Sequence, residues 1–241
     1  MTRIIIAGDS WGAHSYEKGF IHDDLKGFKW HPKKSYVLYP GPAHFLSKLT
    51  GLEVIITADH GVCNSEAISK LNKIDYKDDI VLFYKTGVLR EISRAHINKT
   101  NFYTTKDCKK DIEYYLEEFY KEASKIKAKY FGLIGGCTAI DVTRAEKYNI
   151  DVLESSLTTF LFPNYNDSHE FDNIHYWNEF NYINGWNGVD PYFKHGVMVS
   201  SDKIEFWREH KDLFCKHHPT LRCNEIISRR IIECLKDKNI L

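Results

Sequence analysis

Residues 3–12 read Arg3-Ile4-Ile5-Ile6-Ala7-Gly8-Asp9-Ser10-Trp11-Gly12. A short β-branched run that ends at Gly and Asp predicts a buried strand, and Trp11-Gly12 can open a helix. Ser10 is then expected at a strand-to-helix turn, where backbone N–H groups favour developing negative charge. A serine hydroxyl can act as a nucleophile there if a base lies nearby. The plainer alternative is a turn in which Asp9 or Ser10 only caps the helix.

The rest of the chain alternates between short apolar runs and helical patterns. Further strands are predicted at Val54–Thr57, Ile80–Tyr84 and Phe131–Ile134. Helices are predicted at residues 43–50, 64–72, 107–128 and Leu221–Leu235. Alternation of this kind predicts an α/β fold, with a mostly parallel sheet between helices and the functional groups at the carboxyl ends of its strands. We expect the irregular segments 15–42 and 160–200 to be loops, and residues 1–241 to form a single domain.

Composition excludes several classes of function. The 241 residues suit one large α/β domain, and an apolar share of 43% is enough for its core. Basic and acidic residues balance at 33 each, so neither nucleic acid nor a membrane surface is an expected partner. Residues 3–7 are too short for the apolar part of a signal peptide, which favours a cytoplasmic protein. Its six cysteines are then expected to be reduced, most of them packed as small apolar side chains.

Three further segments carry candidate functional groups. Ala58-Asp59-His60-Gly61-Val62-Cys63-Asn64-Ser65 follows the second strand, and Lys85-Thr86-Gly87-Val88-Leu89-Arg90 follows the third. Cys215-Lys216-His217-His218-Pro219 precedes the C-terminal helix. Together with the block around Ser10, these segments resemble the SGNH/GDSL hydrolases, in the form of their divergent, phage-associated members, over essentially the whole chain. The resemblance implies a three-layer flavodoxin-like fold and hydrolysis of an ester, often an O-acetyl group on a carbohydrate, without a metal or other cofactor.

The resemblance also assigns roles. Ser10 is the expected nucleophile and His218 the expected base, with His217 as the competing assignment. The main-chain N–H groups of Ser10 and Gly61 are expected to bind the oxyanion. Where the family carries a third-block asparagine that completes the oxyanion hole, this sequence has Thr86, whose hydroxyl could donate from the same place.

The acid that should orient the histidine is missing. The family ends in Asp-x-x-His-Pro, but the residue three before His218 is Cys215. Asp212 is our first choice as a substitute, with Glu209 or a main-chain carbonyl as alternatives. Because loss of the acid costs such enzymes orders of magnitude in rate, a non-catalytic module that binds glycans or a protein remains an alternative function.

Other residues are candidates for binding. We expect Trp11, Asn64 and Arg90 to contact the substrate. The aromatic and amide-rich segment 160–200 could form a wall for sugar rings, or it could be an aromatic minicore. A zinc site is a further interpretation of the C-terminal corner, but the spacing fits no standard pattern for its candidate ligands, which are His210, Cys215, His217, His218 and Cys223.

Overall fold

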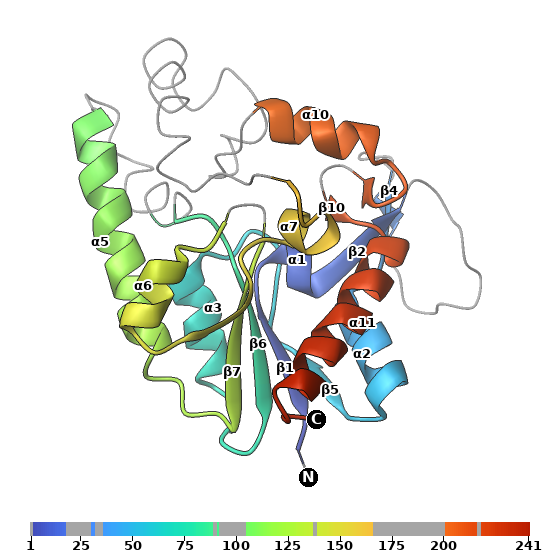
Figure 1. Cartoon of the computed structure of the whole chain (residues 1–241), viewed down its shortest axis with the longest axis horizontal. Coiled ribbons are helices and arrows are strands. Elements are labelled where there is room, and N and C mark those ends of the chain that lie inside the picture. Colours follow the sequence, from blue (N-terminus) through green and yellow to red (C-terminus); the bar gives the residue numbers. More distant parts are fainter. Residues whose placement is uncertain are drawn as a thin grey trace.

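A five-stranded parallel sheet forms the centre of the molecule (Figure 1). The computed structural model describes residues 2–17, 30–31, 36–88, 91, 105–136, 139–165, 201–215 and 218–241. The strands are β1 (Ile4–Gly8), β5 (Val54–Ile56), β6 (Ile80–Lys85), β7 (Tyr130–Gly135) and β8 (Asp151–Glu154). Their spatial order is β5-β1-β6-β7-β8, so β5, the second strand of this sheet along the chain, lies outside β1, as in flavodoxin-like folds. The predicted fold class is confirmed.

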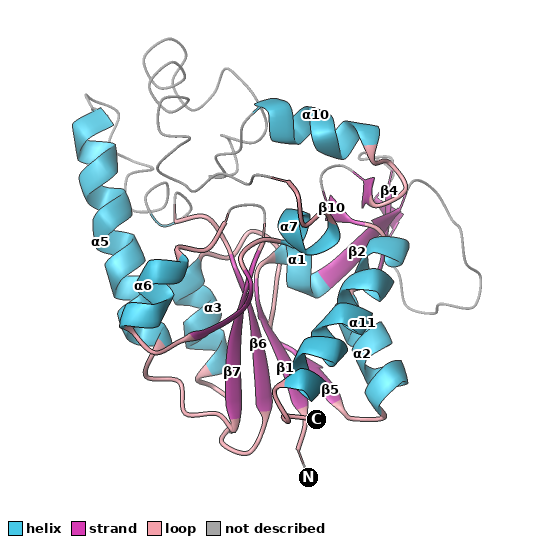
Figure 2. Cartoon of the chain, viewed as in Figure 1, coloured by secondary structure: helices cyan, strands magenta, loops and turns pink. Residues whose placement is uncertain are grey.

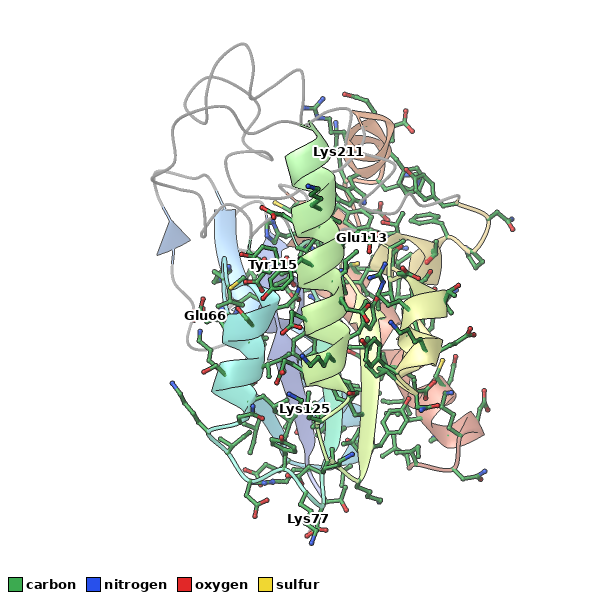
Figure 3. The ribbon with its side chains drawn as sticks, turned by 90° about the vertical axis from the view of Figure 1, so that its left-hand side faces the viewer. Glu66, Lys77, Glu113, Tyr115, Lys125 and Lys211 are labelled. Carbon is green, nitrogen blue, oxygen red and sulfur yellow. The ribbon has the colours of Figure 1, made fainter. Side chains whose placement is uncertain are left out.

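Helices cover both faces of the sheet, as the ribbon coloured by secondary structure shows (Figure 2). One face carries α3 (Asn64–Leu71), α5 (Thr105–Ala123) and α6 (Val142–Lys147). Figure 3 looks at the molecule from this side, with α3 and α5 in front. The other face carries α1 (Ser10–Ala13), α2 (Pro42–Thr50), α7 (Leu157–Leu161), α10 (Ser201–Glu209) and α11 (Leu221–Asp237). Of the described helices, none is long and apolar enough to cross a membrane.

Alternation along the strands builds the two cores. Ile5 and Ala7 pack with the α3–α5 side, whereas Ile4 and Ile6 pack with the α2–α11 side. Successive side chains of a strand point to opposite faces, so a strand with helices on both sides must be apolar throughout. All five residues of β1 are buried, which explains why the run of three isoleucines was a reliable signal.

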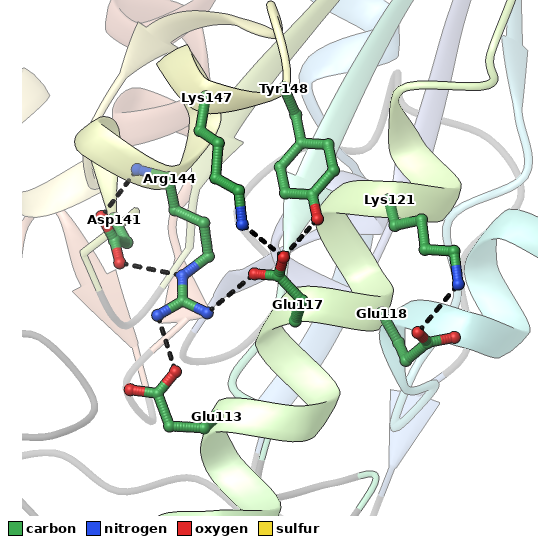
Figure 4. Close-up of polar contacts among 8 residues, drawn as sticks. All are labelled: Glu113, Glu117, Glu118, Lys121, Asp141, Arg144, Lys147 and Tyr148. Carbon is green, nitrogen blue, oxygen red and sulfur yellow. Dashed lines mark hydrogen bonds and ion pairs between the residues drawn. The ribbon is translucent and has the colours of Figure 1, made fainter.

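A network of charged groups joins α5 to α6 on the outer surface (Figure 4). The Arg144 guanidinium bonds to the carboxylates of Glu113, Glu117 and Asp141. Hydrogen bonds from Lys147 and Tyr148 lower the pKa of Glu117. Because the carboxylates and Lys147 are partly exposed, solvent screens the network and it contributes modestly to stability. It lies on the face of the sheet opposite Ser10.

Three short strands correct the expectation that residues 15–42 form a loop. β2 (His14–Glu17), β3 (Trp30–His31) and β4 (Tyr36–Pro40) make an antiparallel sheet in the order β2-β4-β3. The paired residues of β2 and β4 are at least twenty positions apart in the chain, so no local sequence pattern predicts their pairing. The predicted helix 107–128 ends early, at Ala123, and β8 with its preceding α6 was not predicted.

Candidate active site

The turn after β1 places Ser10 at the carboxyl edge of the sheet. Asp9 caps α1, and its carboxylate accepts a hydrogen bond from the Trp11 N–H at 3.0 Å. Gly8 has a φ of +111°, and a Cβ at this position would lie 2.0 Å from the main-chain oxygen of Tyr84. Only glycine allows the two backbones to approach in this way. Ser10 is therefore the first helical residue after a tightly constrained turn, and it is only 2% exposed.

Ser10 meets His218 across the whole length of the chain. The Ser10 Oγ lies 3.1 Å from the His218 Nε2. His218 begins β10 (His218–Pro219), which pairs with β9 (Phe214–Cys215) in a small antiparallel hairpin. Thr220 then caps α11 by accepting the Cys223 N–H. The proximity expected from the order of the blocks is present, although the catalytic roles of the two residues remain predictions.

Trp11 lies in an aromatic cluster beside the histidine. Its ring centroid is 5.3 Å from that of Trp207, 6.1 Å from that of Phe214 and 6.4 Å from that of His218. The residue is 3% exposed, so its ring is engaged in core packing. The expected contact of Trp11 with substrate stays a prediction, because its ring packs among Trp207, Phe214 and His218.

Asp212, the first choice of orienting acid, has a charged partner other than the histidine. The Asp212 carboxylate forms an ion pair with Arg222 at 2.9 Å, and both side chains are more than half exposed. The Asp212 main-chain oxygen accepts the Thr220 hydroxyl at 2.8 Å, which turns this residue toward the start of α11. Glu209, the second choice, is exposed at the end of α10.

We accordingly expect Asp212→Asn to leave hydrolysis of a short-chain aryl ester almost unchanged. An exposed carboxylate that is paired with Arg222 is screened by solvent, so its effect on the half-buried contact between Ser10 and His218 should be small. The measurement is kcat and KM of the variant beside the wild type, and a change within about a factor of two is the scale of an ordinary surface substitution. A hundredfold loss of kcat with unchanged KM would reinstate Asp212 as the orienting acid.

Gly61 lies in the exposed turn between β5 and α3. Its φ is +68°, and the space where a Cβ would stand is open. The preceding His60 stacks on His14, with ring centroids 4.7 Å apart, so the turn packs against the strand that follows α1. Burial lowers the pKa of His14, and the nearby Asp59 opposes this shift. Sequence reasoning missed this histidine pair, since its members are 46 positions apart and only the fold joins them.

Thr86 and Asn64 form a second buried contact at this edge. The Asn64 side chain accepts the Thr86 N–H at 2.9 Å and donates to the Thr86 main-chain oxygen at 2.8 Å. Asn64 is 1% exposed and starts α3, whose N-cap is Cys63. The expected contact of Asn64 with substrate stays a prediction, and its amide is engaged by the main chain of Thr86. The Thr86 Oγ1 is buried and, within the described part of the chain, has no hydrogen-bond partner.

Lys85 is a buried cation that sequence reasoning passed over. It ends β6, is 1% exposed, and donates from Nζ to the Thr86 main-chain oxygen at 3.3 Å. The Nζ also lies 5.8 Å from the centre of the Phe119 ring. A lysine that directly continues an apolar strand was the available signal, because lysine is seldom fully buried without a specific partner.

Several candidates fall outside the described residues or away from Ser10. Arg90, His217 and residues 166–200 lie outside the described ranges. At the start of the aromatic segment, Phe162 packs on Phe206 and His210, so this part is a small aromatic core. In the ranges that the structure describes, no three His, Cys, Asp or Glu side chains are grouped so as to hold a metal ion.

Comparisons with known proteins add two structural likenesses. No protein-family model matches the chain, and no curated protein does. A protein from Desulfitobacterium hafniense DCB-2, described as a lipolytic protein of the G-D-S-L family, is 10% identical with a TM-score of 0.43, over 98% of this chain and 100% of its own. A lipase/acylhydrolase from Enterococcus faecalis is 11% identical with a TM-score of 0.38, over 99% of this chain and 97% of its own. The chain itself has the flavodoxin-like α/β fold that its sequence resemblance to SGNH/GDSL hydrolases implies.

Proposed function

We propose that this protein is a serine ester hydrolase in which Ser10 is the nucleophile and His218 is the general base. The observation that carries the proposal is the 3.1 Å contact between the Ser10 Oγ and the His218 Nε2. The contact lies at the carboxyl edge of a doubly wound sheet, where such folds place their functional groups. The serine is held in a capped turn and the histidine in a hairpin, so both partners come from well-defined backbone.

In the proposed reaction, the His218 Nε2 takes the proton of the Ser10 hydroxyl as Oγ bonds to the ester carbonyl carbon. The carbonyl π electrons move onto oxygen, and the tetrahedral intermediate collapses when the alcohol leaves with the proton from Nε2. Water then gives a proton to the same nitrogen while its oxygen attacks the acyl-serine. Collapse of this second intermediate releases the carboxylic acid and returns the proton to Ser10.

The developing oxyanion needs donors, and three are proposed. They are the main-chain N–H groups of Ser10 and Gly61 and the hydroxyl of Thr86. The buried Thr86 Oγ1 supports this assignment, because a buried hydroxyl without a partner costs about 1–3 kcal/mol unless a ligand engages it. A donor of this kind typically contributes about 3 kcal/mol to transition-state stabilisation.

We propose that the hairpin and the neighbouring aromatic ring help to orient the imidazole. The β9–β10 hairpin holds the backbone of His218, and the Trp11 ring packs near its imidazole. Mutated triads that lack their acid retain part of their activity, so a Ser–His dyad remains catalytic at a reduced rate. The proposed substrate is a small acyl ester, for which an O-acetyl group on a carbohydrate is the leading candidate.

One observation favours a second candidate, a non-catalytic module with an SGNH-like fold that binds glycans or a protein. Asp212 is the carboxylate nearest to His218 in the sequence and the first choice to replace the missing acid. Its side chain forms an ion pair with Arg222. The family acid three residues before His218 is replaced by Cys215, and selection for binding alone would tolerate the loss of that acid.

A fluorophosphonate probe distinguishes the two functions, since it reacts covalently only with an activated serine. We expect the wild type to be labelled, with the modified peptide containing Ser10, and Ser10→Ala to remain unlabelled. Ser228→Ala is the matched control because Ser228 is equally buried but bonds to the Pro42 main-chain oxygen. A wild type that stays unlabelled under conditions where a known serine hydrolase reacts would favour the binding module.

A further inference from the structure

Asn64 bridges two of the segments that surround Ser10. It is the first residue of α3, whereas Thr86 directly follows β6, and the two are 22 positions apart. Their contact uses both ends of the amide: Oδ1 accepts the Thr86 N–H at 2.9 Å, and Nδ2 donates to the Thr86 oxygen at 2.8 Å. Two bonds of opposite direction fix both the position and the rotation of that stretch of main chain.

The main chain of Thr86 is held from a third side by Lys85. Its Nζ reaches the same main-chain oxygen at 3.3 Å, so this oxygen accepts two donors. The Thr86 hydroxyl, in contrast, is buried and has no partner among the described residues. The main chain of Thr86 is therefore fully hydrogen-bonded while its hydroxyl is not. This pattern is expected where a hydroxyl is positioned to donate to a bound ligand.

The register of the sheet brings this hydroxyl to the level of Ser10. Gly8 pairs with Tyr84 in the ladder between β1 and β6, and the Asp9 N–H donates to the Tyr84 oxygen. Ser10 and Thr86 each follow two residues after that pair. Along β6, the side chains of Ile80, Leu82 and Tyr84 belong to the core that also contains Trp11. Continued alternation assigns Thr86 to the same face as α1.

We propose that Asn64 is a positioning residue that holds the main chain of Thr86 so that the Thr86 hydroxyl donates to the oxyanion formed on Ser10. This inference rests on the proposed function. In this arrangement Asn64 does not touch the substrate. The family's third-block asparagine is missing from this chain, and Thr86 stands in its place with a shorter side chain. Asn64, from the preceding block, would compensate by holding the Thr86 main chain.

The test is a double-mutant cycle in the full-length protein, with p-nitrophenyl acetate as the probe substrate. Thr86→Val removes the hydroxyl at nearly constant volume and should lower kcat by about 10²–10³-fold with little change in KM. Asn64→Ala should lower kcat by a similar factor through misplacement of the same hydroxyl. The double variant should then be as slow as Thr86→Val within about twofold, because both changes remove one interaction. Thr86→Ser, which keeps the hydroxyl, should retain most of the rate.

A purely structural Asn64 predicts something different. Its loss would lower the melting temperature but leave kcat per folded molecule near that of the wild type, and any kinetic effect would multiply with that of Thr86→Val. Either result overturns the inference. If Asn64→Ala fails to fold, Asn64→Asp replaces it in the cycle, since it retains an acceptor for the Thr86 N–H but loses the donor to the Thr86 oxygen.

Failure of the inference is distinguishable from failure of the proposed function. A wild type that is labelled by fluorophosphonate and hydrolyses the probe, combined with an Asn64→Ala variant of unchanged kcat, overturns the inference alone. A wild type that is inert to both reagents overturns the proposed function and the inference together.

Discussion

Replacing Ser10 with alanine should abolish hydrolysis of a short-chain aryl ester and leave the fold intact. The hydroxyl is the only group lost, and its observed partner is the His218 Nε2 at 3.1 Å. Removing the nucleophile of a serine hydrolase removes the acyl-enzyme route altogether, so we expect kcat to fall by about 10³-fold or more. The cap of α1 should survive, because it is the Asp9 carboxylate that bonds to the Trp11 N–H. The measurements are steady-state kinetics and the thermal unfolding transition.

The comparison needs a serine that is buried but remote from the imidazole. Ser228→Ala serves this purpose, since its hydroxyl donates to the Pro42 main-chain oxygen in the interface between α11 and α2. We expect this variant to lose some stability and to keep its rate. Equal turnover by Ser10→Ala and the wild type, in preparations free of contaminating esterases, would remove Ser10 from the mechanism.

Replacing Gly8 with alanine should have the largest effect on stability. The new Cβ would lie 2.0 Å from the Tyr84 main-chain oxygen and 2.8 Å from its nitrogen, which no rotamer change can relieve. The φ of +111° adds strain for any residue with a side chain. Because the clash is between adjacent parallel strands, relief requires β1 and β6 to separate. We expect a loss of about 4 kcal/mol or more, measured by urea unfolding, or an insoluble protein.

Gly51→Ala is the matched control for backbone strain without a clash. Gly51 ends α2 with a φ of +71°, but nothing lies within 4 Å of where its Cβ would stand. A left-handed alanine there should cost only about 1–2 kcal/mol. If Gly8→Ala were no more destabilising than Gly51→Ala, the close approach of β1 and β6 described here would be wrong.

Much of the fold was predictable from the sequence because its signals are local. The apolar runs at Ile4, Val54, Ile80 and Phe131 all became parallel strands. The signal is strongest for β1 and β6, which are covered on both faces and therefore apolar almost throughout. The turn at Ser10 was predictable for the same reason, as Asp9 caps the helix through a bond to a residue only two positions away. The antiparallel strands β2 and β4 were missed, because their pairing depends on contacts with a distant segment.

The candidate site was likewise predictable in part. The resemblance in the order of the blocks predicted that Ser10 and His218 meet, and they do: Ser10 follows the carboxyl end of β1, whereas the hairpin before α11 brings His218 to the same edge. The order could not say where individual side chains point. Asp212 pairs with Arg222 in solvent, and Asn64 turns inward to the Thr86 main chain. The sequence alone therefore determined the class of fold and predicted the meeting of serine and histidine. Only the tertiary structure decided the partners of Asp212, Asn64 and Lys85. Each of these contacts depends on which groups the packed chain places within hydrogen-bonding distance.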